Sequence, residues 1–114
     1  MKRGTVVLAV LPFTDLTGLK RRPAVIVSPE NRPEDDVVIA FLTSFKGDPL
    51  QPADLLIPAD DPDFKRTGLK RPSVLRLGKL FTLQRGLLLG KLGELSPRLM
   101  QQVDVRLRIA LGLR

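Results

Sequence analysis

Three consecutive cations, Lys20, Arg21 and Arg22, stand directly before Pro23 and an apolar run. Adjacent positive charges repel one another, so folding gains nothing from gathering them, and a polyanion is the natural partner. The planar fork of an arginine can grip two phosphate oxygens and stabilise negative charge that builds up on them. Arg22, held by the proline where a strand begins, suits this task better than Lys20, whose stem is mobile. The alternative is a basic loop that is merely solvated, as most charge runs are.

Side chains alone can cleave RNA, because the ribose 2′-hydroxyl attacks the neighbouring phosphate once its proton is removed and the charge on phosphorus is stabilised. The chain has no histidine and no cysteine, so carboxylates, hydroxyls, lysines and arginines are the candidates. Thr43 and Ser44 follow an apolar strand and could orient a phosphate or relay a proton, although hydroxyls that end a strand usually satisfy the backbone. Asp15 is a lone acid near the cations, where an Asx-turn or a salt bridge is its ordinary role.

Composition narrows the possible classes of function. Nineteen Lys and Arg against 12 Asp and Glu give a net charge of +7, which favours RNA, DNA or an acidic protein as partner. Five phenylalanines with no Trp or Tyr argue against base stacking on aromatic platforms, so phosphate neutralisation must carry more of any nucleic-acid contact. Without Cys or His, disulfides, thiolate nucleophiles and the usual zinc sites are excluded.

Neither a metal nor a cofactor is expected. The carboxylates at 35–36 and 60–63 lack calcium-loop spacing, and solvated turns explain them. The apolar runs are too short to span a bilayer. The run near the N-terminus is cut by Pro12 and followed by Asp15, which argues against a signal peptide. We expect a cytoplasmic protein that makes no membrane contact, and the lack of cysteine suits that compartment.

A chain of 114 residues is long enough for a real core, and one domain over 1–114 is expected. Short apolar stretches separated by proline, glycine and acidic turns predict a series of strands. These strands are expected at 4–11, 24–27, 37–42, 55–57, 73–77, 79–83 and 87–92, with a bend at Gly78. The stretch 24–27 is apolar throughout, which places it in the middle of a sheet.

The only helix that the sequence predicts lies near the C-terminus. Ser96 is a good N-cap, Pro97 suits the first helical position, and Gly112 suits the end. Apolar residues recur at helical spacing at Leu99, Met100, Val103, Leu107, Ala110 and Leu111. Val105 and Ile109 widen this stripe, which favours burial on two sides, against the sheet and against a partner.

A second basic segment resembles the first. Residues 67–72 read Thr-Gly-Leu-Lys-Arg-Pro, and residues 17–23 read Thr-Gly-Leu-Lys-Arg-Arg-Pro. The flanking residues do not match, so we interpret the pair as one local solution used twice rather than as a tandem repeat. On one face of the fold, Lys70 and Arg71 would join the first cluster in a basic groove. On opposite faces the two segments would make none.

Taken in order, these motifs resemble the MazF/PemK family of toxins from type II toxin-antitoxin modules. The similarity is collinear over nearly the whole chain and rests on Arg3-Gly4, Pro12-Phe13-Thr14-Asp15, Lys20-Arg21-Arg22-Pro23-Ala24-Val25, Thr43-Ser44, Thr67-Gly68-Leu69, Ser73-Val74-Leu75-Arg76 and Lys79-Leu80. The resemblance implies a mainly β fold, an SH3-like small barrel of the PemK/CcdB type with a C-terminal helix, and a homodimer. It also implies a metal-independent endoribonuclease, or mRNA interferase, that cleaves single-stranded RNA. A cognate antitoxin would occupy the RNA groove with its acidic tail, and the toxin-antitoxin complex would bind DNA.

The resemblance also assigns roles to residues. Arg22 falls on the family's active-site arginine and Thr43 on its active-site threonine, which reverses the preference for a structural role at Thr43. Arg76 falls near a second functional arginine of the PemK branch. The remaining candidates for RNA contact are Lys20, Arg21, Ser44, Lys70 and Arg71.

Two positions depart from the family pattern. The acid that PemK-like members carry two residues after their second arginine is here Gly78, and the glutamate of some MazF members falls near Thr17. If a carboxylate base is required, Asp15 is the nearby candidate. Two alternatives to the active nuclease therefore stay open. One is a member that binds RNA and antitoxin without turnover, which Gly78 favours. The other is a gyrase-poisoning toxin like CcdB, against which Arg22-Pro23 and Thr43 count.

Overall fold

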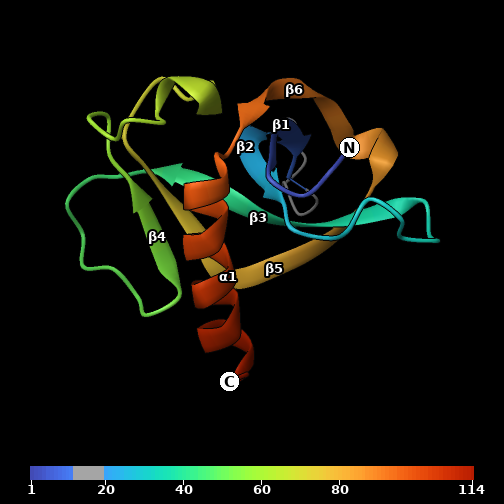
Figure 1. Ribbon diagram of the computed structural model, residues 1–114. Helices are drawn as coiled ribbons and strands as arrows, with labels where there is room; N and C mark the ends of the chain where they lie inside the picture. The colour runs from blue at the N-terminus through green and yellow to red at the C-terminus, as the bar shows by residue number, and fades with distance from the viewer. Residues whose placement is uncertain (12–19) are drawn as a thin grey trace.

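In the described part of the chain, six antiparallel strands form one curved sheet in the order β4-β5-β3-β2-β1-β6, and one α-helix crosses one face of it (Figure 1). The computed structural model describes residues 1–11 and 20–114. The strands are β1 (Thr5–Val10), β2 (Arg21–Ile26), β3 (Asp36–Ser44), β4 (Asp54–Ile57), β5 (Ser73–Gln84) and β6 (Leu88–Glu94). The helix is α1 (Pro97–Leu111), and two short 3-10 turns are η1 (Lys65–Thr67) and η2 (Arg85–Leu87). The predicted mainly β fold with a C-terminal helix is confirmed.

Strand β2 lies in the interior of the sheet, between β1 and β3, as the apolar run predicted. It begins earlier than expected, at Arg21, because β1 provides a backbone partner for the cations: Val10 pairs with Arg21, and Ala9 pairs with Arg22. On the other side of β2, Ala24 pairs with Phe41 of β3. Two residues of the predicted basic loop are therefore part of the sheet.

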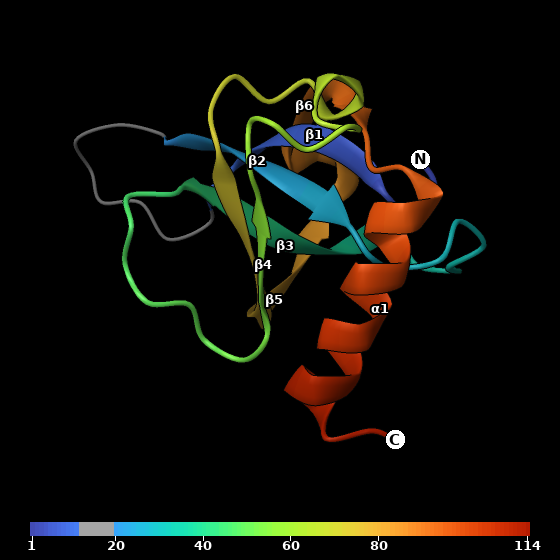
Figure 2. The same ribbon diagram turned by 60° about the vertical axis from the view of Figure 1, so that its left-hand side comes forward.

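The two apolar segments predicted at 73–77 and 79–83 form one long strand, β5. The expected irregularity is present, since the ladder between β3 and β5 shifts register between Ala40 and Leu42. The first part of β5 also pairs with β4, where Arg76 stands opposite Asp54. The first part of β5 therefore lies between β3 and β4 and is paired with both, and β4 runs beside it (Figure 2). Neither 3-10 turn was predicted.

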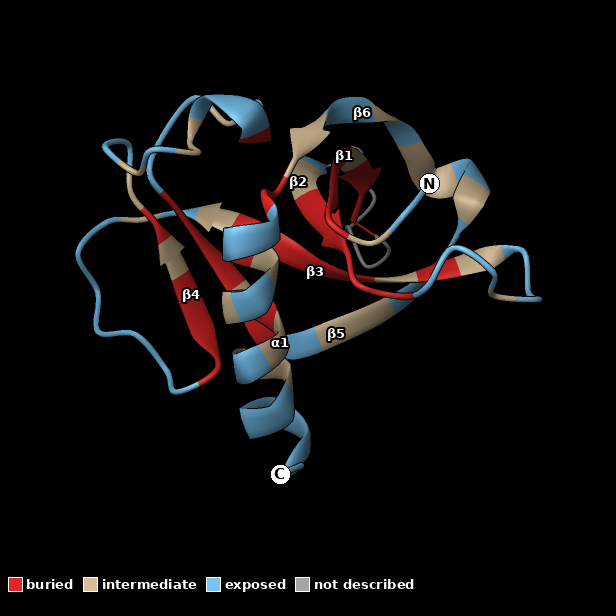
Figure 3. Ribbon diagram, in the orientation of Figure 1, coloured by how far each residue is buried: buried red, intermediate tan, exposed pale blue. Residues whose placement is uncertain are grey.

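Side chains of the strands alternate between two apolar clusters, as the two-residue period of a strand requires. On β2, Val25 belongs to the cluster beneath α1, whereas Ala24 and Ile26 belong to the cluster on the other face. Leu99 and Val103 attach the helix to the first cluster, and both are buried. Figure 3 shows the buried segments of the strands facing the helix.

Both predicted ends of α1 are confirmed. The Ser96 hydroxyl accepts a hydrogen bond from the Leu99 amide at 3.2 Å, and Gly112 ends the helix in the left-handed conformation with φ 67°. The stripe is buried over a shorter length than its spacing suggested, because the last turns extend beyond the sheet, and Ala110 and Leu111 are exposed (Figure 3). Val105 and Ile109, which widen the stripe, are 50% and 51% exposed.

The acidic turn at 60–63 anchors the start of α1 instead of standing free in solvent. The Ser96 hydroxyl donates a hydrogen bond to Asp63 at 2.6 Å, and Arg98 donates to both Asp61 and Asp63. The hydrogen bond from Ser96, followed by the interactions with Arg98, lowers the pKa of Asp63 below its ordinary value. Nowhere in 1–11 and 20–114 do three or more His, Cys, Asp or Glu gather as a group that could hold a metal ion. Within the same residues, no helix is both long and apolar enough to cross a membrane.

Candidate active site

The predicted site residues gather where β2 begins and β3 ends. A cavity of about 510 Å³ opens there between the two strand ends, the residues after β3 and the start of β5. Its lining consists of Arg21, Arg22, Pro23, Leu42, Thr43, Ser44, Lys46, Arg71, Ser73 and Arg76. Six of the residues that the sequence singled out therefore lie around one cavity: Arg21, Arg22, Thr43, Ser44, Arg71 and Arg76.

Strand geometry explains why Arg22 and Thr43 meet. Ala24 and Phe41 are paired across β2 and β3. Arg22 and Thr43 each lie two residues further along, toward the same end of this strand pair. A step of two residues keeps a side chain on the same face of a strand. Arg22 and Thr43 are both half-buried, so the sheet supports them while one side stays open to the cavity.

The charged side chains that line this cavity, among the described residues, are all positive. Five of the described residues that line it are cations, and none of them is a carboxylate. Arg71 comes from the second basic segment, so the two similar segments do lie on one face, as a basic groove requires. Lys46, just after β3, is a cation that no sequence pattern indicated. Such a concave cationic surface attracts polyanions, and its walls focus the field.

Asp54 is the feature that sequence reasoning missed. Its side chain is only 6% exposed, and its carboxylate accepts hydrogen bonds from Arg76 Nε at 3.0 Å and from the Gln51 amide at 2.8 Å. Arg106 of α1 donates to the backbone carbonyl of Asp54 at 2.9 Å. Arg76 is therefore held by a buried acid on the neighbouring strand, and the helix holds that acid in turn.

Asp54 also lies near the position where the family's acid is missing. Gly78 and the Asp54–Arg76 pair line one small cavity of about 240 Å³. The same pair lines a second cavity of about 250 Å³ together with Thr43 and Ser44. Only the pairing of β4 with β5 brings this carboxylate to the site, and no local sequence signal could have indicated it.

We expect replacement of Asp54 by alanine to lower the free energy of unfolding by about 1–3 kcal/mol, because the Gln51 amide loses its hydrogen bond to a charged carboxylate. The ion pair itself contributes little to this figure, because Arg76 is 36% exposed and solvent screens the charge. Urea unfolding measures the difference. Asp48→Ala is the matched control, since Asp48 is an exposed acid on the same connection between β3 and β4. Equal stability of the two variants would contradict the anchoring role of Asp54.

The other predicted residues lie elsewhere. Lys70 lines an adjoining pocket rather than the main cavity. Lys20 is exposed, and its carbonyl accepts a hydrogen bond from the Leu11 amide; its side chain lines neither space. Asp15, the proposed base, lies outside the described residues, as does Thr17.

Residues 2–111 match the family model described as the PemK-like, MazF-like toxin of type II toxin-antitoxin systems. A search of curated protein sequences returned no significant match. Among solved structures, the chain is similar to an endoribonuclease in complex with its cognate antitoxin from a Mycobacterial species, with 28% identity and a TM-score of 0.75 over 100% of this chain and 97% of that one.

Two further structures have the same fold. One is MazE-MazF from Deinococcus radiodurans, with 25% identity and a TM-score of 0.73 over 100% of this chain and 98% of that chain. The other is the Mycobacterium tuberculosis toxin MazF-mt6, with 20% identity and a TM-score of 0.75 over 96% of this chain and 98% of that chain. The family match extends over nearly every residue of the chain and includes every residue that lines the cationic cavity. The chain belongs to the family of PemK-like, MazF-like toxins of type II toxin-antitoxin systems.

Proposed function

We propose that this protein is the toxin of a type II toxin-antitoxin module and cleaves single-stranded RNA without a metal ion. One observation carries the proposal: Arg22 and Thr43 line a single cationic cavity at the ends of two adjacent strands. Membership of the toxin family and similarity to a structure named as an endoribonuclease support it.

In the proposed reaction, the 2′-oxygen of one ribose attacks the adjacent phosphorus, and the bond to the 5′-oxygen breaks. The products are a 2′,3′-cyclic phosphate and a 5′-hydroxyl, so one proton leaves the 2′-hydroxyl and one reaches the 5′-oxygen. Arg22 stabilises the extra negative charge on the pentavalent phosphorus, and Thr43 orients the phosphate. Arg21, Lys46 and Arg71 neutralise neighbouring phosphates.

Arg76 and Asp54 have separate tasks in this proposal. Both carboxylate oxygens of Asp54 already accept hydrogen bonds within the protein, so Asp54 orients Arg76 rather than removing a proton. The oriented guanidinium then faces RNA in the cavity that Arg22 also lines. Asp15 remains the proposed base.

Two partners are proposed besides RNA. One is a cognate antitoxin, whose acidic residues would complement the cationic cavity; the similar Mycobacterial endoribonuclease is in complex with its own antitoxin. The other is a second copy of the chain, which would cover the exposed apolar residues of α1. These residues are Val105, Ile109 and Leu111, and the exposed Leu113 follows just after the helix. The cytoplasm, where mRNA is found, is the proposed compartment.

The test is incubation of the purified protein with a long single-stranded RNA in excess EDTA. We expect defined fragments: the upstream product of each cleavage ends in a 2′,3′-cyclic phosphate at its 3′ end, and the downstream product begins with a 5′-hydroxyl. The same RNA annealed to its complement is the matched control and should stay intact. Binding without fragments would contradict catalysis and favour the member without turnover, which the glycine at position 78 suggests. Inhibition of DNA supercoiling by gyrase would favour a CcdB-like activity instead.

A further inference from the structure

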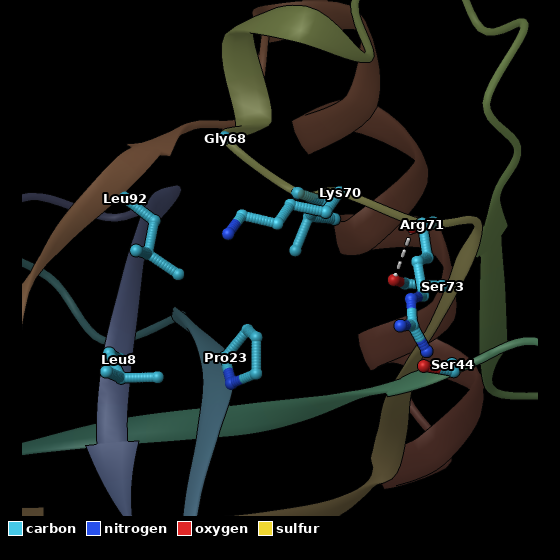
Figure 4. Close-up of a pocket in the computed structure, with 9 residues that line it drawn as sticks. Leu8, Pro23, Ser44, Gly68, Lys70, Arg71, Ser73 and Leu92 are labelled. Atoms are coloured by element: carbon cyan, nitrogen blue, oxygen red, sulfur yellow. Dashed lines mark hydrogen bonds between the residues drawn. The ribbon is translucent and has the colours of Figure 1, made fainter.

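A second pocket adjoins the cationic cavity and differs from it in chemistry. Its volume is about 380 Å³, within the range of sites that enclose a small ligand. Leucine and proline side chains from four separate segments form most of its wall, and two cations complete it (Figure 4). The lining residues are Leu8, Pro23, Ser44, Gly68, Leu69, Lys70, Arg71, Ser73 and Leu92.

The wall of this pocket is rigid because the η1 segment packs tightly against β6. A Cβ added to Gly68 would lie 2.1 Å from the Leu92 carbonyl oxygen, and one added to Gly93 would lie 2.3 Å from the Arg66 carbonyl oxygen. Thr67, fully buried, donates to the Phe64 carbonyl at 2.6 Å and accepts from the Leu69 amide at 3.1 Å. A preformed pocket binds its ligand without the entropic cost of ordering a loop.

The two cations of the pocket point in different directions. The Lys70 ammonium extends into the space between Leu92 and Pro23, whereas the Arg71 guanidinium lies beside Ser44 (Figure 4). Lys70 can therefore meet acceptor atoms of a ligand inside the pocket. Arg71 stands at the boundary, since it lines both this pocket and the cationic cavity.

The pocket and the cationic cavity adjoin along a shared wall. Pro23, Ser44, Arg71 and Ser73 line both of them. A ligand that occupies both needs an anionic group for the cationic cavity, next to a largely apolar body that carries a hydrogen-bond acceptor for Lys70. A nucleotide of single-stranded RNA has this combination, because its phosphate is covalently joined through the sugar to an unpaired base.

We propose that this pocket binds the base of the nucleotide next to the cleaved phosphodiester, with Lys70 on the base edge and Arg71 on the linking phosphate. The proposal rests on the proposed function, because RNA in the cationic cavity brings the base to the pocket. A base held between aliphatic side chains replaces the aromatic stacking for which this chain lacks Trp and Tyr.

The test uses a fluorescent ten-nucleotide RNA with 2′-fluoro groups throughout, which removes the attacking hydroxyl. Its sequence is that around the strongest cleavage site, or that of the tightest binder from a random pool if nothing is cleaved. One abasic nucleotide is moved along the strand, and fluorescence anisotropy measures affinity for the wild type, Leu92→Ala and Leu89→Ala. Leu89 is the matched control, since it lies on β6 at 48% exposure, against 39% for Leu92, and does not line the pocket.

At one position we expect base removal to weaken binding to the wild type and to Leu89→Ala about tenfold, through lost apolar burial and the lost contact with Lys70. Base removal should weaken binding to Leu92→Ala less than about threefold, because the pocket of this variant has already lost part of the apolar wall that contacts the base. Lys70→Ala should reduce this position-specific loss in the same way, and Lys65→Ala, an exposed lysine of η1, should not.

Each other result has a distinct meaning. If RNA is cleaved but base removal lowers the affinity equally at every position for all variants, the base pocket is overturned and the nuclease is not. The occupant of the pocket would then be an apolar side chain of a protein partner. If Leu92→Ala and Lys70→Ala reduce the effect of base removal at one position, but no RNA is cleaved in EDTA, the base pocket is supported and catalysis is overturned. Failure to bind any RNA would overturn both.

Discussion

Replacement of Arg22 by alanine is expected to slow RNA cleavage about 100- to 1,000-fold, the usual effect of losing one preorganised donor to a developing negative charge. Arg22 is half-buried at the start of β2, where its backbone is paired with Ala9 of β1, and its side chain lines the cavity with Thr43, so the sheet places this cation at the cavity before substrate arrives. A fixed charge of this kind stabilises the transition state more than the ground state. Single-turnover cleavage of a labelled RNA measures the chemical step directly.

Two controls make the role of Arg22 specific. Arg21→Ala removes an exposed cation that is adjacent in the same strand, so it should weaken RNA binding while changing the single-turnover rate at saturation less than about tenfold. Arg22→Lys keeps the charge but cannot grip two phosphate oxygens, and we expect an intermediate rate. If Arg21→Ala slowed the saturated rate as much as Arg22→Ala, the catalytic assignment would be wrong and both residues would be phosphate guides.

The sequence can indicate a contact of this site when the residues that make it are close together along the chain. The caps of α1 were predictable because Ser96, Pro97 and Gly112 act within one turn of the helix. The association of Arg22 with Thr43 was available only through the resemblance to the MazF/PemK family. In physical terms it depends on the register of β2 against β3, which no residue pattern specifies locally.

The Asp54–Arg76 pair shows where sequence reasoning ends. Asp54 follows a proline-rich connection and looks like an ordinary turn acid, yet it is buried because β4 pairs with the bent first part of β5. The family pattern places an acid at position 78, where this chain has glycine, and the sequence indicated only Asp15 in its place, although the carboxylate of Asp54 lines the same small cavity as Gly78 from the neighbouring strand. Side chains that meet across a sheet are separated in sequence by the whole length of the intervening chain.

The second large effect is expected on stability, at the contact that shapes the apolar pocket. We expect Gly68→Ala to lower the free energy of unfolding by about 2–5 kcal/mol, from a strained backbone and an overpacked contact together. Gly68 has φ 72°, in the left-handed region that alanine adopts at a cost of about 1–2 kcal/mol. Its new Cβ would also lie 2.1 Å from the Leu92 carbonyl oxygen, so η1 and β6 would have to separate.

Gly47→Ala separates these two causes. Gly47 has a comparable φ of 88°, but a Cβ built there meets nothing within 4 Å, so this variant should show only the backbone cost. Urea unfolding of both variants gives the difference, which reports the contact between η1 and β6. Because Lys70 and Arg71 follow this contact closely, Gly68→Ala should also weaken RNA binding under conditions where the variant is folded. Equal destabilisation by the two substitutions would mean that η1 moves away from β6 at little cost, and the pocket would then not be preformed.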